Sequence, residues 1–193
     1  MLQDLDRTLE ELLKNELPPE VISPPEGKSV TISFSTPDKD FATRVDLPAI
    51  DLFLYNVREN MELRTVPWSV ERENGMASKK RNPVRVDCSY LITAWLEDDN
   101  DNNITEHRLL GEVMKVLLRH RIIPGAVLQG ELQGLEPPIR TTALGQPQLQ
   151  SMGEFWQAIG GKPRAALNYT VTISVDVNDV VETIPLVTNI QVR

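Results

Sequence analysis

Two Gly-Lys pairs are the residues in this chain whose types could cradle a phosphate. A phosphate-binding loop needs another glycine five residues before the pair and a Ser or Thr directly after it, so that backbone amides wrap the phosphate. Gly161-Lys162 has Trp156 and Pro163 at those positions, and Gly27-Lys28-Ser29 has Ile22 in place of the distant glycine. The sequence therefore predicts no nucleotide-binding loop.

The acidic run at 97–103 and the two histidines are the residues that could bind a metal ion. If the run is read as a calcium loop from its second residue, Asn103 and Leu109 stand where glycine and glutamate are required. His107 and His120 lie in one predicted helix and point about 220° apart, so they cannot share an ion. We expect a solvated acidic turn, with weak divalent-cation binding as the alternative.

Cys88 is the single cysteine, and its neighbours favour a buried, unreactive thiol. It lies in a strand pattern between Val86 and Tyr90, with no histidine nearby in the sequence to activate it. Neither a nucleophile elbow nor a zinc-hydrolase helix occurs, and no spacing singles out two carboxylates for acid–base work. We therefore expect a protein that is not an enzyme and holds no cofactor and no metal ion.

The composition indicates a soluble globular protein. Its 193 residues carry 20 Lys and Arg against 28 Asp and Glu, a formal net charge of −8, and 40% are hydrophobic. This charge argues against a nucleic-acid binder, which needs a basic surface. No apolar run reaches the ~18 residues that span a bilayer, and the acidic start does not look like a secretion signal. We expect synthesis and assembly in the cytoplasm.

Hydrophobic periodicity predicts an α+β fold, a single domain with a mainly antiparallel β-sheet flanked by helices. Leucines between positions 2 and 13 form one stripe of a first helix, which Pro18-Pro19 ends. Strands are predicted at Lys28–Ser35, Ile50–Val57, Val84–Leu96 and Tyr169–Val177, with room for two more at 129–150, and a short helix at Met152–Ile159. A longer helix from Asn103 to about Arg121 is expected to bury Leu110, Val113, Met114, Leu117 and Leu118.

The long polar connection from Glu62 to Asn82 is the most unusual segment. Its Asn-Gly turn at 74–75 suggests either an extended hairpin or a functional loop. It carries a basic cluster in an acidic chain, which would suit an acidic partner surface; a solvated loop is the alternative. The two tryptophans of the set could be interface anchors or core residues, and its proline belongs to the tail. The candidate partner interface therefore consists of Trp68, Lys79, Lys80, Arg81, Arg85, Trp156 and Pro185.

The C-terminal tail is β-branched and apolar but contains Pro185. Proline is confined to edge positions of a sheet because it cannot donate a ladder hydrogen bond. We therefore divide the chain into a main domain at 1–178 and a tail at 179–193, which forms an edge strand or a strand paired with a partner.

Four stretches, in order and spacing, resemble the cap, or tail-terminator, proteins of phage-tail-like, extracellular-type contractile injection systems. The resemblance covers roughly residues 1 to 177 and rests on structural rather than catalytic motifs. The stretches are Asp51–Asn60 with Arg64 and Trp68, Pro83–Trp95, Glu106–Gly111, and Gly153–Gly160 continuing through Lys162-Pro163-Arg164 to Leu167–Thr172.

The resemblance implies a tail-terminator-like fold and a structural function. Such a protein forms a ring, a homohexamer, on the distal end of the inner tube and ends assembly of tube and sheath. Its partners would be itself, the inner-tube protein and the sheath protein, with no nucleic acid and no membrane insertion. A baseplate or adaptor component of the same machine, or an unrelated small-molecule-binding domain, are the alternatives.

Overall fold

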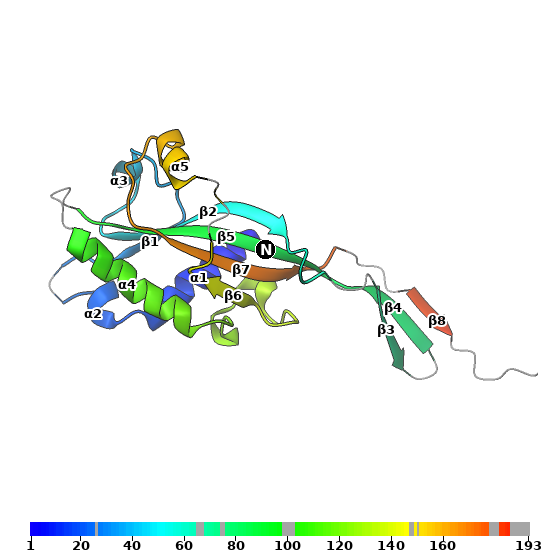
Figure 1. The fold of residues 1–193 in the computed structure, drawn as a ribbon. Coiled ribbons are helices and arrows are strands. Elements are labelled where there is room, and N and C mark those ends of the chain that lie inside the picture. Colours follow the sequence, from blue (N-terminus) through cyan, green and yellow to red (C-terminus); the bar gives the residue numbers. More distant parts are fainter. Residues whose placement is uncertain are drawn as a thin grey trace, which may run out of the picture.

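A five-stranded sheet forms the body of the molecule in this computed structural model (Figure 1). The structure describes residues 1–25, 27–64, 68–73, 76–97, 103–146, 149, 151–177 and 182–185. For residues 68–73, 76–81, 103–104 and 182–185 it describes the backbone alone. The strand order is β1 (Thr31–Ser33), β2 (Ala49–Glu59), β5 (Val84–Trp95), β7 (Leu167–Val175) and β6 (Arg140–Ala143). Only β1 and β2 pair in parallel. The predicted α+β fold with a mainly antiparallel sheet is confirmed.

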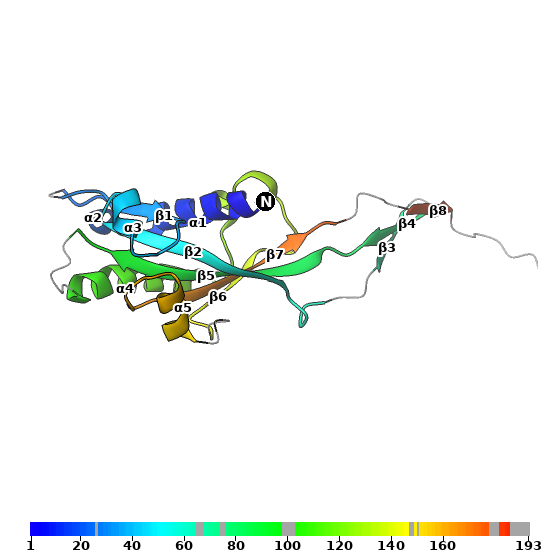
Figure 2. The same ribbon diagram turned by 90° about the horizontal axis from the view of Figure 1, so that it is seen from above.

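Two helices cover one face of this sheet and bury the main core. They are α1 (Leu2–Glu16) and α4 (Asn103–Arg119), which lie side by side under the sheet (Figures 1 and 2). The leucine stripe of α1 packs against alternate residues of the central strands, because strand side chains alternate between the faces of a sheet. The core includes Leu5, Leu9, Leu12, Leu13, Ile50, Leu52, Cys88, Tyr90, Ile92, Val113, Leu117, Tyr169, Val171 and Ile173.

The opposite face of the sheet carries both polar and apolar side chains and is covered at one end by two short helices. These are α3 (Phe41–Arg44) and α5 (Met152–Ala158), and they lie above the sheet (Figure 1). Phe41 stacks on Trp95 with ring centroids 4.3 Å apart, and these two residues form a second small cluster with Ala49. A further short helix, α2 (Pro19–Ile22), follows α1, and two 3-10 turns, η1 (Gly125–Val127) and η2 (Gly130–Leu132), precede β6.

A three-stranded sheet projects from the body as an arm (Figures 1 and 2). It consists of β3 (Trp68–Glu73), β4 (Met76–Arg81) and β8 (Glu182–Pro185), in the order β3-β4-β8. Strands β3 and β4 pair antiparallel from Trp68↔Arg81 to Glu73↔Met76, so the long polar connection is an extended hairpin. Strand β8 of the tail pairs with β4 of the same chain and forms one edge of the arm.

The structure corrects several sequence-based boundaries. Helix α4 ends at Arg119, where Leu118 is 42% exposed and Met114 is half-buried, because Leu109 and Val116 occupy the core side of the helix instead. Strand β1 has three residues rather than eight. The segment 129–150 holds one strand, β6, among its described residues, and the 3-10 turn η2 occupies part of it. The acidic run lies largely outside the described residues.

Candidate assembly interface

The arm holds most of the residues that the sequence singles out as an interface. Lys79, Lys80 and Arg81 are consecutive in β4, and the register places Trp68 of β3 beside Arg81. Pro185 ends β8 and pairs with Met76 at the other end of β4. The fold therefore gathers candidate residues from two distant parts of the sequence on one small sheet.

Arg85 lies where the arm joins the body, and its side chain is buried. It is 8% exposed, and its Nη1 atom donates a hydrogen bond to Ser174 Oγ, 2.5 Å away. Burial lowers the pKa of the Arg85 guanidinium, Arg140 acts in the same direction, and Asp87 opposes them. Arg85 is thus engaged within its own chain and anchors the root of the arm.

Asn60 fastens the chain to β5 as it leaves β2 for the arm. Its backbone N–H donates to the Arg85 carbonyl at 2.8 Å, and its Nδ2 donates to both carboxylate oxygens of Asp87 at 3.0 and 3.1 Å. Its Oδ1 accepts from the N–H of Leu63 at 2.9 Å. One side chain therefore orients the outgoing strand with respect to the returning one.

Asp87 is the centre of this root and is 5% exposed. Besides Asn60, it accepts a hydrogen bond from Thr172 Oγ1 at 2.8 Å, and Arg58 Nε lies 3.8 Å from its Oδ2. A buried carboxylate is stable only when its oxygens are hydrogen-bonded or paired. Residues of β2, β5 and β7, with Asn60 directly after β2, thus form one polar unit. We call it the arm root: Arg58, Asn60, Arg85, Asp87, Thr172 and Ser174.

Trp156 is the other candidate whose side chain lies inside the body. It is 3% exposed, packs edge-on against Phe155 with centroids 5.3 Å apart, and accepts a backbone hydrogen bond from Gly161 at 3.0 Å. A Cβ at Gly161 would approach the Trp156 ring to 3.1 Å, so glycine is needed there for close packing. Arg85 and Trp156 are thus both engaged within the chain, and the other five candidate residues belong to the strands of the arm.

A second contact links three of the quoted stretches at the opposite end of the body. The Arg164 guanidinium stacks on the Trp95 ring, 3.5 Å from its centroid. Its Nη1 donates to the Ala94 carbonyl at 2.9 Å and to Glu106 Oε1 at 3.3 Å. This contact ties the start of α4 to the end of β5, which gives these residues a structural role.

The described part of the chain shows no cluster of three or more His, Cys, Asp or Glu residues that could hold a metal ion. His107 lies on α4 and His120 directly follows that helix. Cys88 is fully buried, with its pKa raised to about 12 chiefly by desolvation. Within the same residues, no helix has both the length and the apolar character needed to cross a bilayer.

Apart from Arg85, the residues of the arm root were not among the candidates that the sequence singled out. The polar alternation Arg85, Asp87, Ser89 in β5 was the available signal, since it places polar residues on the face away from the core. This alternation did not reveal which of the three residues would contact Asn60 and Thr172. Those two partners lie 27 and 85 positions from Asp87 in the sequence, so no local pattern links them to it.

Comparison with known proteins places this architecture among terminator structures. The chain superposes on the sheath and tube terminator of an extracellular contractile injection system, PVC, in its extended state, with a TM-score of 0.70 and 25% identity. It superposes on the tube-terminating cap of the anti-feeding prophage, AFP, with a TM-score of 0.69 and 26% identity. Both matches cover 100% of this chain, which spans 62% and 61% of those two chains.

No curated protein matches the chain. The Pvc16 N-terminal domain family matches residues 4–189, which includes the body and the arm. The resemblance to terminator proteins is therefore confirmed by both the family match and the fold. This chain belongs to the Pvc16 N-terminal domain family.

Proposed function

We propose that this protein is the structural cap, or terminator, of a contractile injection system. The observation that carries the proposal is the similarity of the whole chain, arm included, to terminators of tube and sheath at TM-scores of 0.70 and 0.69. A cap depends on the shape of its surface and needs no chemical step. This agrees with a site that consists of packing contacts and the arm root. It also agrees with the expectation that the protein is not an enzyme.

A cap acts by occupying a surface. A tube of stacked rings grows because each ring exposes the surface that receives the next one, a head-to-tail interface that does not close by itself. A terminator complements that surface on one side and offers no equivalent on the other. No bond is made or broken, so the requirement is a rigid body with a defined orientation.

We further propose that the cap is a ring, most simply of six copies, that links the sheath to the tube. In each copy the body would meet the tube end, and the projecting arm would reach the last turn of the sheath. The basic cluster Lys79, Lys80 and Arg81 would orient the arm on an acidic partner surface, since charge complementarity steers association and fixes register. Support comes from the fold, in which the arm projects away from the body (Figure 1).

Tube length tests this function. In cells that lack the protein, tubes should vary in length and the sheath should be lost or incomplete at the distal end; re-expression should restore both. Gold labelling of a tagged copy should mark the distal end, whereas labelling at the opposite end would favour a baseplate or adaptor component. Normal tubes and an intact sheath in its absence would refute the proposal.

A further inference from the structure

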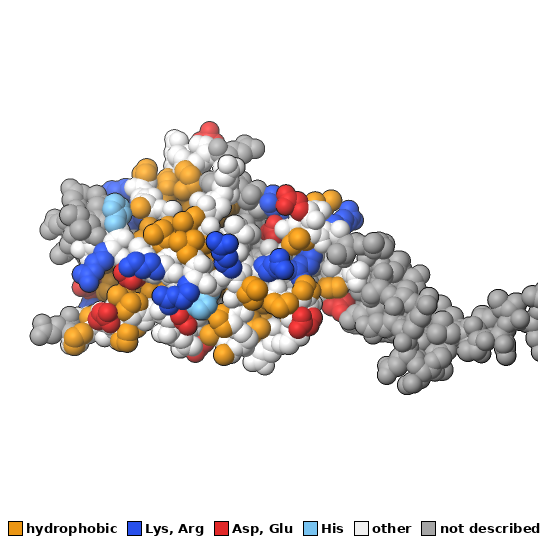
Figure 3. Space-filling model, turned by 60° about the horizontal axis from the view of Figure 1, so that its bottom comes forward, with side chains coloured by type: hydrophobic (Ala, Val, Ile, Leu, Met, Phe, Trp, Pro, Cys, Tyr) orange, Lys and Arg blue, Asp and Glu red, His pale blue; other side chains and the backbone are white. Residues whose placement is uncertain are grey.

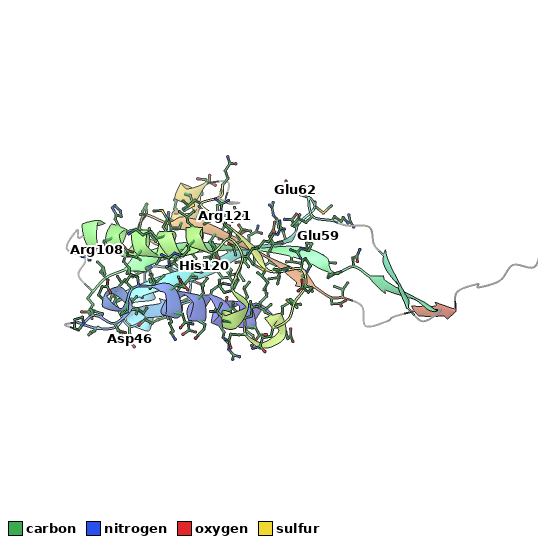
Figure 4. All side chains as sticks on the ribbon, turned by 90° about the horizontal axis from the view of Figure 1, so that it is seen from below. Asp46, Glu59, Glu62, Arg108, His120 and Arg121 are labelled. Carbon is green, nitrogen blue, oxygen red and sulfur yellow. The ribbon has the colours of Figure 1, made fainter. Side chains whose placement is uncertain are left out.

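Helix α4 turns one continuous face to solvent. Arg108, Lys115 and Arg119 follow one another at spacings of seven and four residues, so they share one side of the helix. Arg121 and Ile122 come shortly after the helix ends and are also exposed, so we include them. We call Arg108, Gly111, Lys115, Leu118, Arg119, Arg121 and Ile122 the α4 face; Figure 4 shows Arg108 and Arg121 at its two ends.

The α4 face is basic, although the protein is acidic. Two of its four cations form ion pairs with carboxylates. Lys115 Nζ lies 2.7 Å from Glu112 Oε1, and Arg119 Nη1 lies 3.1 Å from Glu16 Oε2. The region therefore carries a formal charge of +2 within a chain of −8, which leaves −10 on the rest of the molecule. Figure 3 shows Lys and Arg side chains gathered around hydrophobic ones on this side of the body.

Gly111 lies within this face, and no described residue outside its own helix turn packs against the position of its missing side chain. A Cβ built on it would meet nothing within 4 Å. Glycine inside a helix is less stable than alanine by roughly 0.5–1 kcal/mol, so it weakens α4 without allowing any close contact inside the monomer. A helix surface without a side chain lets another backbone approach closely, which indicates that the partner lies outside the chain.

Two large apolar side chains extend the surface beside the cations. Leu118 is 42% exposed and Ile122 is 51% exposed. Protein–protein interfaces combine an apolar centre with a polar rim. A charged surface that only keeps a protein soluble, or that binds the phosphates of a nucleic acid, needs no apolar centre. The mixed character favours a protein partner over a polyanion.

We propose that the α4 face docks on a second copy of this chain, against a different and acidic surface of that copy. A contact between two α4 faces would oppose like charges, so the interface must be head-to-tail. Such an interface forms a closed ring when the rotation between successive copies adds up to a full turn. The proposal rests on the proposed cap function, and names the lateral surface by which each copy would meet the next copy in the ring.

Charge reversal tests the inference in purified protein. Mass photometry and sedimentation velocity should show wild-type self-association that weakens as salt is raised. Arg119→Glu with Arg121→Glu should weaken it by about 100-fold at low salt. The control is Arg7→Glu with Lys14→Glu on α1, which changes the net charge by the same amount at side chains that are 66% and 51% exposed. This control should leave self-association unchanged.

Gly111 gives a second test that separates docking from folding. Gly111→Gln places a long side chain of good helix propensity in open space, so the melting temperature of the monomer should rise. The same side chain should block close approach and abolish self-association. Gly111→Gln protein that associates like wild type, or wild-type protein that is monomeric up to its solubility limit, would overturn the inference.

Thiol protection locates the covered surface directly. Cys88 is buried, so Ile122→Cys introduces a single exposed thiol. Its reaction with a maleimide should slow at least tenfold when the protein self-associates, while the control Met61→Cys, at a side chain that is 62% exposed, should react at an unchanged rate. Equal reactivity of Cys at position 122 in monomer and oligomer would refute this interface.

The outcome is independent of the test of the cap function. Self-association and thiol protection decide which surface joins the copies, and tube length in cells decides whether the protein terminates tubes. Self-association through another surface, with tube length still controlled by the protein, would reject the α4 face and keep the cap.

Discussion

Asp51 carries an ionisable carboxyl group in a buried position, and burial disfavours the charged form of that group. It lies in β2 with its side chain fully buried, its Oδ1 accepts the Ser35 N–H at 3.1 Å, and its Oδ2 has no partner among the described residues. Desolvation raises its pKa to about 7, against the smaller opposing effects of hydrogen bonds from Ser33 and Ser35. A buried carboxylate with one unsatisfied oxygen favours the protonated form.

This residue should make stability depend on pH. The folded-state pKa is above the unfolded value of 3.8, so the folded state binds the proton more tightly and stability falls as pH rises from about 4 to 7. The contribution is at most about 4 kcal/mol, at ~1.4 kcal/mol per pKa unit. Urea denaturation at pH 5 and pH 8 should show a fall that Asp51→Asn removes.

The exposed Asp46 supplies the control for that measurement. Asp46→Asn makes the same chemical change outside the core and should retain the wild-type fall in stability between pH 5 and pH 8. Identical pH dependence in wild type and Asp51→Asn would show that Asp51 is ionised at no cost in the folded protein.

At the scale of elements, the arm is held to the body by the arm root. Asn60→Ala should remove the hydrogen bonds to Asp87 and to Leu63, at a cost of about 1–3 kcal/mol because Asp87 stays buried. Hydrogen exchange should rise at residues 60–64 and 85–87. The exchange rates in α1 and α4 should not change.

The control for this variant is Asn15→Ala, which removes an exposed hydrogen bond to Glu11 on α1. It should leave exchange at the arm root at the wild-type level. If Asn60→Ala also leaves those amides protected, the arm is held by backbone pairing alone.

The tail strand β8 should matter to the arm and not to the body. Its described pairing is with β4 only, so deletion of residues 179–193 should change the stability of the body by less than about 0.5 kcal/mol. The deletion uncovers the edge of β4 and should weaken attachment of the cap to the sheath. Circular dichroism and counts of capped particles give the two readouts; intact capping would show that β8 is dispensable.

At the scale of the whole molecule, the charged arm and the body should be separable. Changing Lys79, Lys80 and Arg81 to glutamate should leave thermal stability nearly unchanged and reduce the fraction of capped tubes, because steering by complementary charge is lost. Electron microscopy of tube ends measures the effect. The α1 variant with Arg7→Glu and Lys14→Glu is the matched control, and normal capping by the arm variant would contradict the role of the basic cluster.

Much of the fold followed from local patterns. The leucine stripe predicted α1, and alternation predicted β5 and β7. The short helix expected at Met152–Ile159 is α5, which ends at Ala158 and is followed by Gly160 with φ of 67°. Alternation also predicted a strand at Lys28–Ser35, but only Thr31–Ser33 pair with β2, because the pattern of one segment does not say how much of it a neighbouring strand can reach. Leu118 was placed in the core because its spacing fits the stripe, yet the helix rotates Val116 inward instead.

Local patterns were sufficient to predict the main helices and strands, their buried sides and the family resemblance, because these depend on residues close together in the chain and on the order of motifs. Which side chains meet follows from the folded arrangement instead: Asn60 with Asp87, Arg164 with Trp95, and β8 with β4. These contacts join residues far apart in sequence, where no local period constrains the register. The same reason left the α4 face unseen, since an exposed helix face is defined by what the rest of the chain fails to cover.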